Sequence, residues 1–143
     1  MKLGVYKLDH RATVPEFKTE QAACFDIVAI DREIHRAAAI YSTGLAFEIP
    51  AGYCLEIFSR SGHGFNEDLR LVNSVGVIDA DYKGELKVKL AYDGPAYLRP
   101  SWPMVGDRVA QGRLKKLVKT DIVEVFEQTE TERGAGAFGS TGK

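Results

Sequence analysis

Residues 86–91 read Leu-Lys-Val-Lys-Leu-Ala, with an apolar side chain at every second position. Because successive side chains of a β-strand point to opposite faces, this alternation predicts a strand with one buried and one exposed face. The same alternation recurs at residues 45–49 and 55–57. The sequence therefore predicts β structure through its central part.

Turn-forming residues separate further segments of high β-propensity. These strand candidates are Leu3–Leu8, Phe25–Ala29, Leu69–Asn73, Asp107–Leu114 and Ile122–Phe126. Helical structure is expected only in short stretches, such as the one around Gly62–Glu67. Many short strands at this spacing are typical of antiparallel folds, so we predict an all-β protein built as a distorted jelly-roll β-barrel or sandwich.

The composition is that of an ordinary one-domain globular protein. The chain has 143 residues, of which 45% are apolar and 27% charged, with a formal net charge of −1. This charge balance argues against general binding to nucleic acid or to acidic membranes. Apolar runs are short, so we expect neither a signal peptide nor a transmembrane span, and a cytoplasmic location. Cys24 and Cys54 lack metal-type spacing, which predicts reduced thiols.

The composition changes after Glu132, where a glycine-rich arm begins that we expect to be flexible. We therefore divide the chain into a β domain, residues 1–132, and a C-terminal arm, residues 133–143. The glycines expose backbone N–H groups, Arg133 adds positive charge, and Phe138 offers a face on which a nucleobase stacks. This combination predicts a lid over the phosphates of a nucleotide, although a plain flexible tail has a similar glycine content.

Three polar clusters interrupt the strands. Ser59–Gly62 follows a strand, and its donors suit phosphate groups, but it equally suits a turn or a helix N-cap. Gly76–Glu85 is predicted to be a hairpin tip, in which Asp79 lies at a strand end and suits a general base, unless its acids serve the turn alone. Gly106–Gln111 places Gln111 in an apolar strand, facing either a ligand or solvent.

Five segments, taken in order, resemble the motifs of the trimeric deoxyuridine triphosphatases (dUTP nucleotidohydrolases). They are Ala22–Ile27, Ser59–Gly62, Gly76–Glu85, Gly106–Gln111 and Arg133–Gly142, and they span essentially the whole chain. The resemblance implies hydrolysis of dUTP to dUMP and pyrophosphate by attack of water on the α-phosphorus, with Mg²⁺ as cofactor. Such a reaction supplies dUMP for dTMP synthesis and keeps uracil out of DNA.

The third motif carries the catalytic and base-reading roles in this resemblance. Asp79 matches the carboxylate that activates the attacking water, and Tyr82 matches the ring beneath the deoxyribose, which leaves no room for a 2′-hydroxyl. The backbone from Asn73 to Tyr82 matches the uracil-binding hairpin. The substrate contacts implied in this region are Asn73, Gly76, Ile78, Tyr82 and Lys83.

The second, fourth and first motifs imply the phosphate and metal ligands. Arg60, Ser61 and Gly62 match donors to the inner phosphates, and Gln111 matches a ligand of the α-phosphate and the catalytic water. Asp26 matches the acid that holds Mg²⁺ through its waters, in keeping with the hydration that magnesium retains in proteins.

The fifth motif implies an arm that closes over the substrate. The implied contacts are Arg133, Phe138, Gly139, Ser140 and Thr141, with Phe138 over the uracil and the others at the phosphates. Members with this pattern are homotrimers whose sites draw motifs from more than one subunit. The implied partners are therefore dUTP and further copies of this chain, with neither nucleic acid nor membrane.

Some positions depart from the family's pattern. Cys24 and Ala137 stand where glycine is usual, and His63 replaces an aliphatic residue and is expected at a surface or an interface. The connection 93–105 is longer and richer in proline than usual. Two alternatives remain: a dUTP-gated regulatory protein that binds a partner through this connection, and a dCTP deaminase of the same fold. The deaminases lack the fifth motif, and the intact catalytic positions favour the hydrolase.

Overall fold

The computed structural model describes residues 1–98 and 100–137. Within these residues the chain forms antiparallel strands and one short helix, so the predicted all-β fold is confirmed. The elements are β1 (Gly4–Lys7), β2 (Phe25–Val28), β3 (Asp31–Ile34), β4 (Ala38–Ser42), β5 (Leu45–Glu48), β6 (Tyr53–Phe58), α1 (Ser61–Glu67), β7 (Leu69–Leu71), β8 (Val75–Ile78), β9 (Lys87–Tyr92) and β10 (Arg108–Lys116).

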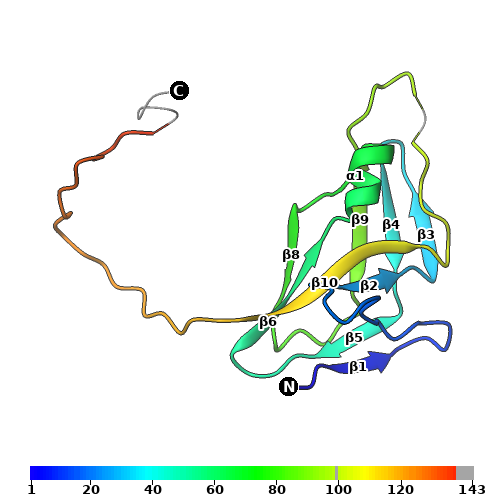
Figure 1. The fold of residues 1–143 in the computed structure, drawn as a ribbon, viewed down its shortest axis with the longest axis horizontal. Coiled ribbons are helices and arrows are strands. Elements are labelled where there is room, and N and C mark those ends of the chain that lie inside the picture. The colour runs from blue at the N-terminus through cyan, green and yellow to red at the C-terminus, as the bar shows by residue number, and fades with distance from the viewer. Residues whose placement is uncertain (99, 138–143) are drawn as a thin grey trace.

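The described strands form three antiparallel sheets (Figure 1). One four-stranded sheet has the order β2-β10-β6-β8, the second has the order β3-β4-β9-β7, and β1 pairs with β5 in a two-stranded sheet. Neighbours such as β2 and β10 come from distant parts of the chain, as is usual in jelly rolls. The sheets stay separate within the described residues, so the fold is a jelly-roll-like sandwich and not a closed barrel.

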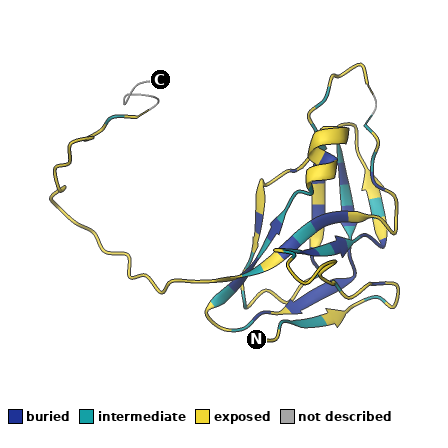
Figure 2. Ribbon diagram, viewed as in Figure 1, coloured by how far each residue is buried: buried dark blue, intermediate teal, exposed yellow. Residues whose placement is uncertain are grey.

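Side chains from all three sheets meet in one apolar core (Figure 2). The apolar side chains of residues 86–90 are buried while Lys87 and Lys89 are exposed, as the alternation in the sequence predicts. From the other four-stranded sheet, β6 contributes Leu55 and Ile57. Each large aliphatic side chain buried in this way contributes about 1.5–3 kcal/mol to the stability of the fold.

Two buried hydroxyl groups form hydrogen bonds with backbone groups. The hydroxyl of Thr43 donates to the carbonyl oxygen of Leu86 at 2.6 Å and accepts from the amide of Leu45 at 3.2 Å. The hydroxyl of Tyr41 donates to the carbonyl oxygen of Pro103 at 3.1 Å. Burial raises the pKa of Tyr41 to about 12, because the ionised phenolate would lose its hydration. Both hydroxyl groups therefore link strand residues to neighbouring connections by hydrogen bonds.

The sequence-based assignment of strands was wrong in some places. Residues 122–126 are outside any strand and exposed, because β-propensity alone gives no ladder without a neighbouring strand. Strands β3 and β4 were not predicted, and of β8 only the end before Asp79 was predicted. The alanines of β4 and Gly76 in β8 have low β-propensity, and only pairing with β9 and β6 makes these segments strands.

After β10 the chain leaves the body of the molecule, and residues 117–135 are exposed (Figure 1). Their apolar side chains include Ile122 and Phe126, which are 97% and 89% exposed.

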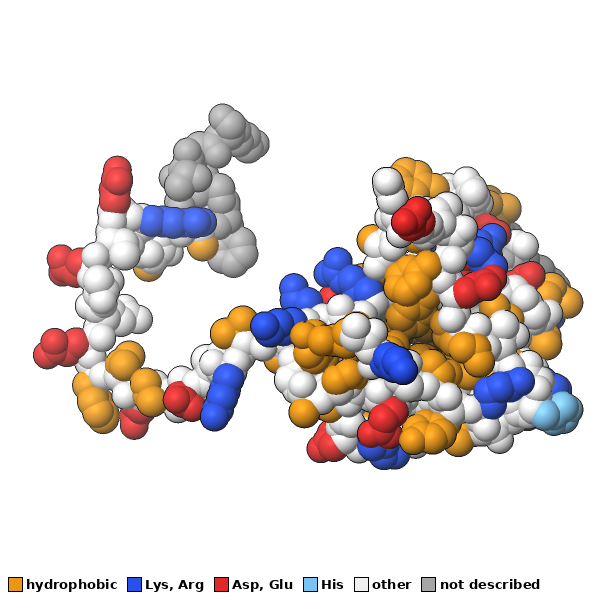
Figure 3. Space-filling model, turned by 60° about the horizontal axis from the view of Figure 1, so that its bottom comes forward, with side chains coloured by type: hydrophobic (Ala, Val, Ile, Leu, Met, Phe, Trp, Pro, Cys, Tyr) orange, Lys and Arg blue, Asp and Glu red, His pale blue; other side chains and the backbone are white. Residues whose placement is uncertain are grey.

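An apolar hollow of about 340 Å³ lies between the N-terminal segment and the sheets, lined by Met1, Leu3, Val5, Val14, Pro15, Phe17, Phe25, Phe47 and Leu114. Figure 3, in which the end of the molecule that carries β1 and β5 comes forward, shows hydrophobic side chains gathered around a hollow.

Candidate functional site

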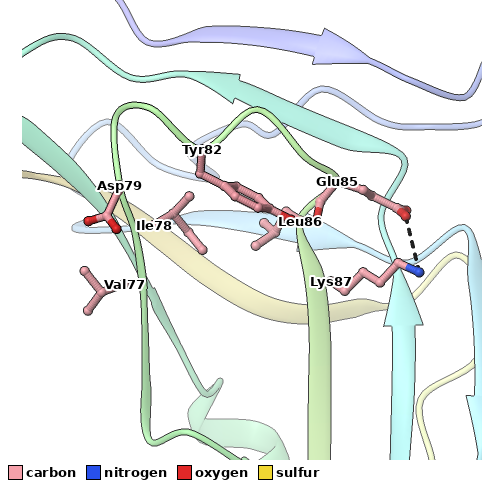
Figure 4. Close-up of a pocket in the computed structure, with 7 residues that line it drawn as sticks. All are labelled: Val77, Ile78, Asp79, Tyr82, Glu85, Leu86 and Lys87. Atoms are coloured by element: carbon pink, nitrogen blue, oxygen red, sulfur yellow. Dashed lines mark hydrogen bonds and ion pairs between the residues drawn. The ribbon is translucent and has the colours of Figure 1, made fainter.

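A cavity of about 460 Å³ lies where the chain passes from β8 to β9 (Figure 4). Its lining residues are Val77, Ile78, Asp79, Tyr82, Glu85, Leu86 and Lys87. The predicted catalytic acid, Asp79, and two predicted substrate contacts, Ile78 and Tyr82, lie together on this cavity. An acid, a ring and an apolar wall at one cavity suit a nucleoside.

Tyr82 has a defined position at this cavity. Its hydroxyl donates to the carbonyl oxygen of Glu85 at 3.0 Å, and its side chain is about half exposed. A Cβ atom at position 84 would lie 2.5 Å from the Tyr82 hydroxyl oxygen. The lack of a side chain at Gly84 therefore leaves room for the ring of Tyr82.

The connection that carries Asp79 is not a β-hairpin, contrary to the prediction. β8 pairs with β6, whereas β9 pairs with β4 and β7, so residues 79–86 pass from one sheet to the other. The segment from Asn73 to Tyr82, expected to be a uracil-binding hairpin, is therefore β8 with a turn on each side. Asp79 directly follows the last residue of β8, so its expected place at a strand end is confirmed.

The other substrate contacts predicted in this region lie in β8 or in the turns beside it. Gly76 lies opposite Ile57, and a Cβ atom at position 76 would lie 3.1 Å from the Cβ atom of Ile57. Asn73 is exposed in the turn that precedes β8. Lys83 is exposed and pairs with Glu48 at 3.1 Å. The turn residues are open to solvent, and β8 itself is held closely against β6.

A second group of site residues surrounds Asp26. Its Oδ1 atom accepts from Arg60 Nε at 3.2 Å, and its Oδ2 atom accepts from Arg108 Nη1 at 3.1 Å. The Asp26 side chain is 16% exposed, so these contacts lie partly out of water. Two guanidinium groups share one carboxylate, which leaves a net positive charge at the position where the sequence predicts phosphates.

Gln111 links three strands at this end of the sheet. It lies opposite Asp26 of β2 and opposite Phe58 of β6 in the pairing of β10. Its Nε2 atom donates to the carbonyl oxygen of Ser59 at 2.9 Å. The side chain therefore belongs to the same end of the molecule as Asp26 and does not simply face solvent.

Ser61 and Gly62 open helix α1 and are exposed. The N-cap position is Arg60, whose side chain makes no capping hydrogen bond, so the alternative of a Ser61 N-cap is not what the structure has. The first amides of any helix lack intrahelical acceptors and can donate to a ligand. Because the Arg60 side chain makes no capping bond, its guanidinium can contact Asp26 instead.

The fold places the two groups at opposite ends of β6. Ile78 pairs with Leu55, and Val75 pairs with Phe58. These two rungs are about 10 Å apart at the usual strand rise, and Asp79 and Arg60 lie beyond them in opposite directions. One copy of the chain therefore does not bring its catalytic candidate and its phosphate donors to the same point.

Comparisons with known proteins identify the family of this chain. The family model described as dUTPase matches residues 10–142. Deoxyuridine 5'-triphosphate nucleotidohydrolase of Nautilia profundicola is 41% identical over 146 residues, which cover 100% of both chains. The enzyme of the same name from Helicobacter pylori strain J99 is 35% identical over 144 residues, covering 99% of this chain and 97% of the other.

The chain belongs to the dUTPase family.

A solved structure of the same family has a similar fold. The dUTPase of Staphylococcus bacteriophage 80alpha, in complex with dUPNHPP, superposes with a TM-score of 0.84 at 25% identity and covers 99% of both chains. The likeness therefore extends over nearly the whole dUTPase chain.

The fifth motif of this dUTPase chain is described only in part. Arg133 Nε donates to the carbonyl oxygen of Gly136 at 2.9 Å within the exposed segment. Phe138, Gly139, Ser140 and Thr141 lie outside the described residues. The assignment of the arm, and of the boundary after residue 132, stays a prediction.

Two residues that complete the Asp26 group of this dUTPase chain were not predicted from the sequence. Arg108 lies in the fourth motif but had no predicted role, although the Gly-Asp-Arg sequence there is a usable signal. His63 was expected at a surface or an interface, but it is buried and contacts Arg60, Glu67 and the carbonyl of Arg108. Its pair with Glu67 has the i,i+4 spacing of a helix and could have been predicted, whereas the contact with the Arg108 carbonyl joins residues 45 positions apart.

Neither cysteine has the environment of a reactive thiol. Burial raises the pKa of Cys24, although the nearby Arg113 acts against it. Burial, with Glu56 and Asp79 nearby, also raises the pKa of Cys54. Both cysteines are free thiols, as predicted.

Residues 1–98 and 100–137 contain no group of three or more His, Cys, Asp or Glu side chains arranged to hold a metal ion. In the same part of the chain, no helix has the length and apolar character that a membrane span requires.

Proposed function

We propose that this chain is a dUTP diphosphatase, which hydrolyses dUTP to dUMP and pyrophosphate by attack of water on the α-phosphorus. The observation that carries the proposal is the position of Asp79, directly after β8 at the cavity that Tyr82 also lines. Family membership and relatives named deoxyuridine 5'-triphosphate nucleotidohydrolase support it. The reaction would supply dUMP for dTMP synthesis and keep uracil out of DNA.

In this proposal the nucleoside half of dUTP occupies the cavity at β8. Asp79 holds and deprotonates the attacking water, a role that typically accelerates a reaction 10²–10⁴-fold. The Tyr82 ring lies beneath the deoxyribose and excludes a 2′-hydroxyl. Backbone groups of residues 73–82, with Asn73 and Lys83 at the turns, read the uracil edge, because a wrong base leaves buried polar groups unpaired.

The triphosphate half occupies the Asp26 group. Arg60 and the first amides of α1, at Ser61 and Gly62, donate to the inner phosphates. Gln111 contacts the α-phosphate and the catalytic water. The surplus positive charge of the two arginines over one carboxylate supports this assignment.

Magnesium fits this group only through water. Each oxygen of Asp26 already accepts one arginine hydrogen bond, so one further acceptor site remains on each oxygen for a metal-bound water. The neighbouring guanidiniums oppose a bare cation, which makes the substrate phosphates the direct ligands. When bound, the ion would neutralise charge on the phosphate chain.

The same geometry supports the proposed homotrimer with shared sites. Asp79 and Arg60 lie at opposite ends of β6, so we assign the two halves of each site to different subunits. The exposed Ile122 and Phe126, together with the apolar hollow at the N-terminal segment, support burial of these surfaces between copies. Arg133 and residues 138–141 then close over a bound nucleotide as a lid.

Pyrophosphate release from dUTP, dCTP, dTTP and UTP with Mg²⁺ tests the proposal, with the wild type, Asp79→Ala and Asp81→Ala. Asp81 is an exposed acid in the same connection and has no assigned role, so it is the matched control. We expect rapid hydrolysis of dUTP alone, lost in Asp79→Ala and kept in Asp81→Ala. Tight dUTP binding without hydrolysis would point to the regulatory alternative, and ammonia release from dCTP would point to the deaminase.

A further inference from the structure

His63 is a buried polar residue at the phosphate end of the molecule. It is 7% exposed and is the only buried residue of helix α1, which consists of residues 61–67. An aliphatic side chain would fill the same place by packing alone. A buried imidazole is costly unless its nitrogens are paired, so the contacts of its two nitrogens indicate what the residue does.

Both ring nitrogens of His63 face acceptors. Nδ1 lies 2.7 Å from Oε2 of Glu67, one turn further along α1, and Nε2 lies 2.8 Å from the carbonyl oxygen of Arg108 in β10. A carbonyl oxygen only accepts, so Nε2 carries a hydrogen and donates. His63 therefore joins helix α1 to strand β10.

The carbonyl oxygen of Arg108 also accepts from Arg60. Arg60 Nη1 donates to it at 3.1 Å, and His63 Nε2 lies 3.5 Å from the same Nη1 atom. A register shift between Arg108 and Ala110 places an extra residue in β10 at this point. Such a bulge interrupts the ladder locally, which leaves this carbonyl available to side chains.

Arg60 is thereby held before any ligand arrives. Its Nε atom pairs with Asp26, its Nη1 atom bonds to the Arg108 carbonyl, and the imidazole of His63 lies against it. A free arginine side chain samples many rotamers, and fixing it in advance lowers the cost of binding a phosphate. The charged groups around His63 are Glu67 on its own helix, Arg60 before it, and Asp107 and Arg108 at the facing end of β10.

We infer that His63 is a positioning residue that holds Arg60 for the triphosphate by fixing the carbonyl oxygen of Arg108. The assignment of Arg60 to phosphate rests on the proposed function. The orientation of Arg60 itself does not rest on it and can be measured without substrate.

Three variants separate positioning from packing. His63→Leu keeps the volume approximately and loses both bonds. His63→Gln places an amide nitrogen near the position of Nε2 and keeps the bond to the Arg108 carbonyl. His63→Asn places it near Nδ1 and keeps only the bond to Glu67. His35→Leu is the control, since His35 is exposed and also pairs with an acid, Glu33.

The first readout is solvent exchange of the Arg60 Nε–H resonance in NMR spectra, assigned with Arg60→Lys. We expect slow exchange in the wild type, in His63→Gln and in His35→Leu, and at least about tenfold faster exchange in His63→Leu and His63→Asn. Equal exchange in His63→Gln and His63→Asn would overturn the inference. The comparison of His63→Gln with His63→Asn tests the inference even if His63→Leu does not fold.

The second readout separates the two halves of the nucleotide. In His63→Leu and His63→Asn we expect dUPNHPP to bind about tenfold more weakly, KM for dUTP to rise more than kcat falls, and deoxyuridine to bind as in the wild type. Equal losses for dUPNHPP and deoxyuridine would overturn the inference in favour of a purely structural role. A wild type that does not hydrolyse dUTP would instead refute the proposed function, while the Arg60 resonance would still test the role of His63.

Discussion

The side-chain amide of Gln111 donates to the carbonyl oxygen of Ser59 at 2.9 Å, which orients it before a ligand binds. Gln111→Glu replaces this donor with a carboxylate that repels both the carbonyl and a phosphate. We expect kcat for dUTP to fall about 10²–10³-fold, the range found when one donor to a developing charge is lost. Pyrophosphate release measures kcat. Gln21→Glu makes the same charge change on an exposed turn, and an equal loss there would contradict the assigned role.

Gly84→Ala tests the placement of Tyr82. The new methyl group would lie 2.5 Å from the tyrosine hydroxyl, so the ring must move and its bond to Glu85 is lost. We expect the preference for dUTP over UTP, measured as the ratio of kcat/KM, to fall about tenfold or more. Gly64→Ala is the control, because its methyl group would meet nothing closer than 3.9 Å. An unchanged ratio in Gly84→Ala would argue against the sugar-sensing role of Tyr82.

Shared sites predict complementation between two inactive variants. Asp79→Ala and Arg60→Ala each lack one half of the site, and these halves lie at opposite ends of β6. If the two variants are co-expressed in equal amounts and assemble at random, about a quarter of all sites would combine an intact Asp79 with an intact Arg60 from different subunits. We therefore expect activity in the mixture and none in either variant alone. An inactive mixture with proven subunit mixing would contradict sharing.

Thr43→Val tests a buried hydrogen bond beside the cavity. The variant keeps the shape of the side chain but leaves the Leu86 carbonyl and the Leu45 amide without their hydroxyl partner. We expect the free energy of unfolding to fall by about 1–3 kcal/mol. Chemical denaturation measures it, and Thr120→Val, at an exposed position, should change it by less than about 0.5 kcal/mol.

The raised pKa of Tyr41 predicts that the folded chain loses stability at alkaline pH. Its pKa is about 12 in the folded chain against an ordinary value of 10.0, so the unfolded chain releases its proton first. Tyr41 therefore leaves the free energy of unfolding unchanged below about pH 10. Between about pH 10 and pH 12 this free energy falls by at most about 1.4 kcal/mol per pH unit. Tyr41→Phe should lack this part of the decline. Unfolding measured at several pH values checks it, with the exposed Tyr97→Phe as control. Parallel profiles for the wild type and Tyr41→Phe would contradict the prediction.

The sequence predicted those features that neighbouring residues determine. Alternation located the strand that contains Val88, the polar start of α1 located the helix, and the apolar pair before Asp79 located its strand end. Pairing over long distances was not predictable, because nothing local states that Asp26 will meet Arg108. The same reason explains the missed strand β4, whose alanines become β structure only beside β9.

The environments predicted for His63 and Asp79 were also partly wrong. His63 was expected at a surface or an interface, since a polar residue in a short helix gives no sign of burial, yet it lies between Glu67 and β10. The hairpin expected at Asp79 was wrong because a turn sequence does not state whether the strands on its two sides pair with each other. The five motifs predicted the candidate residues of the site, and the sheet pairings determine which of these candidates lie together in one copy of the chain.

The pairing of β10 on both of its edges limits where this chain can change in length. One residue inserted between Ala110 and Gln111 would turn Gln111 and every later side chain of β10 to the opposite face and move Gln111 away from Asp26 and Phe58. The tip of the connection after β9 is different, since Tyr97 there is 86% exposed. A fluorescent label or an inserted peptide belongs at this tip, where added length leaves the strand registers unchanged.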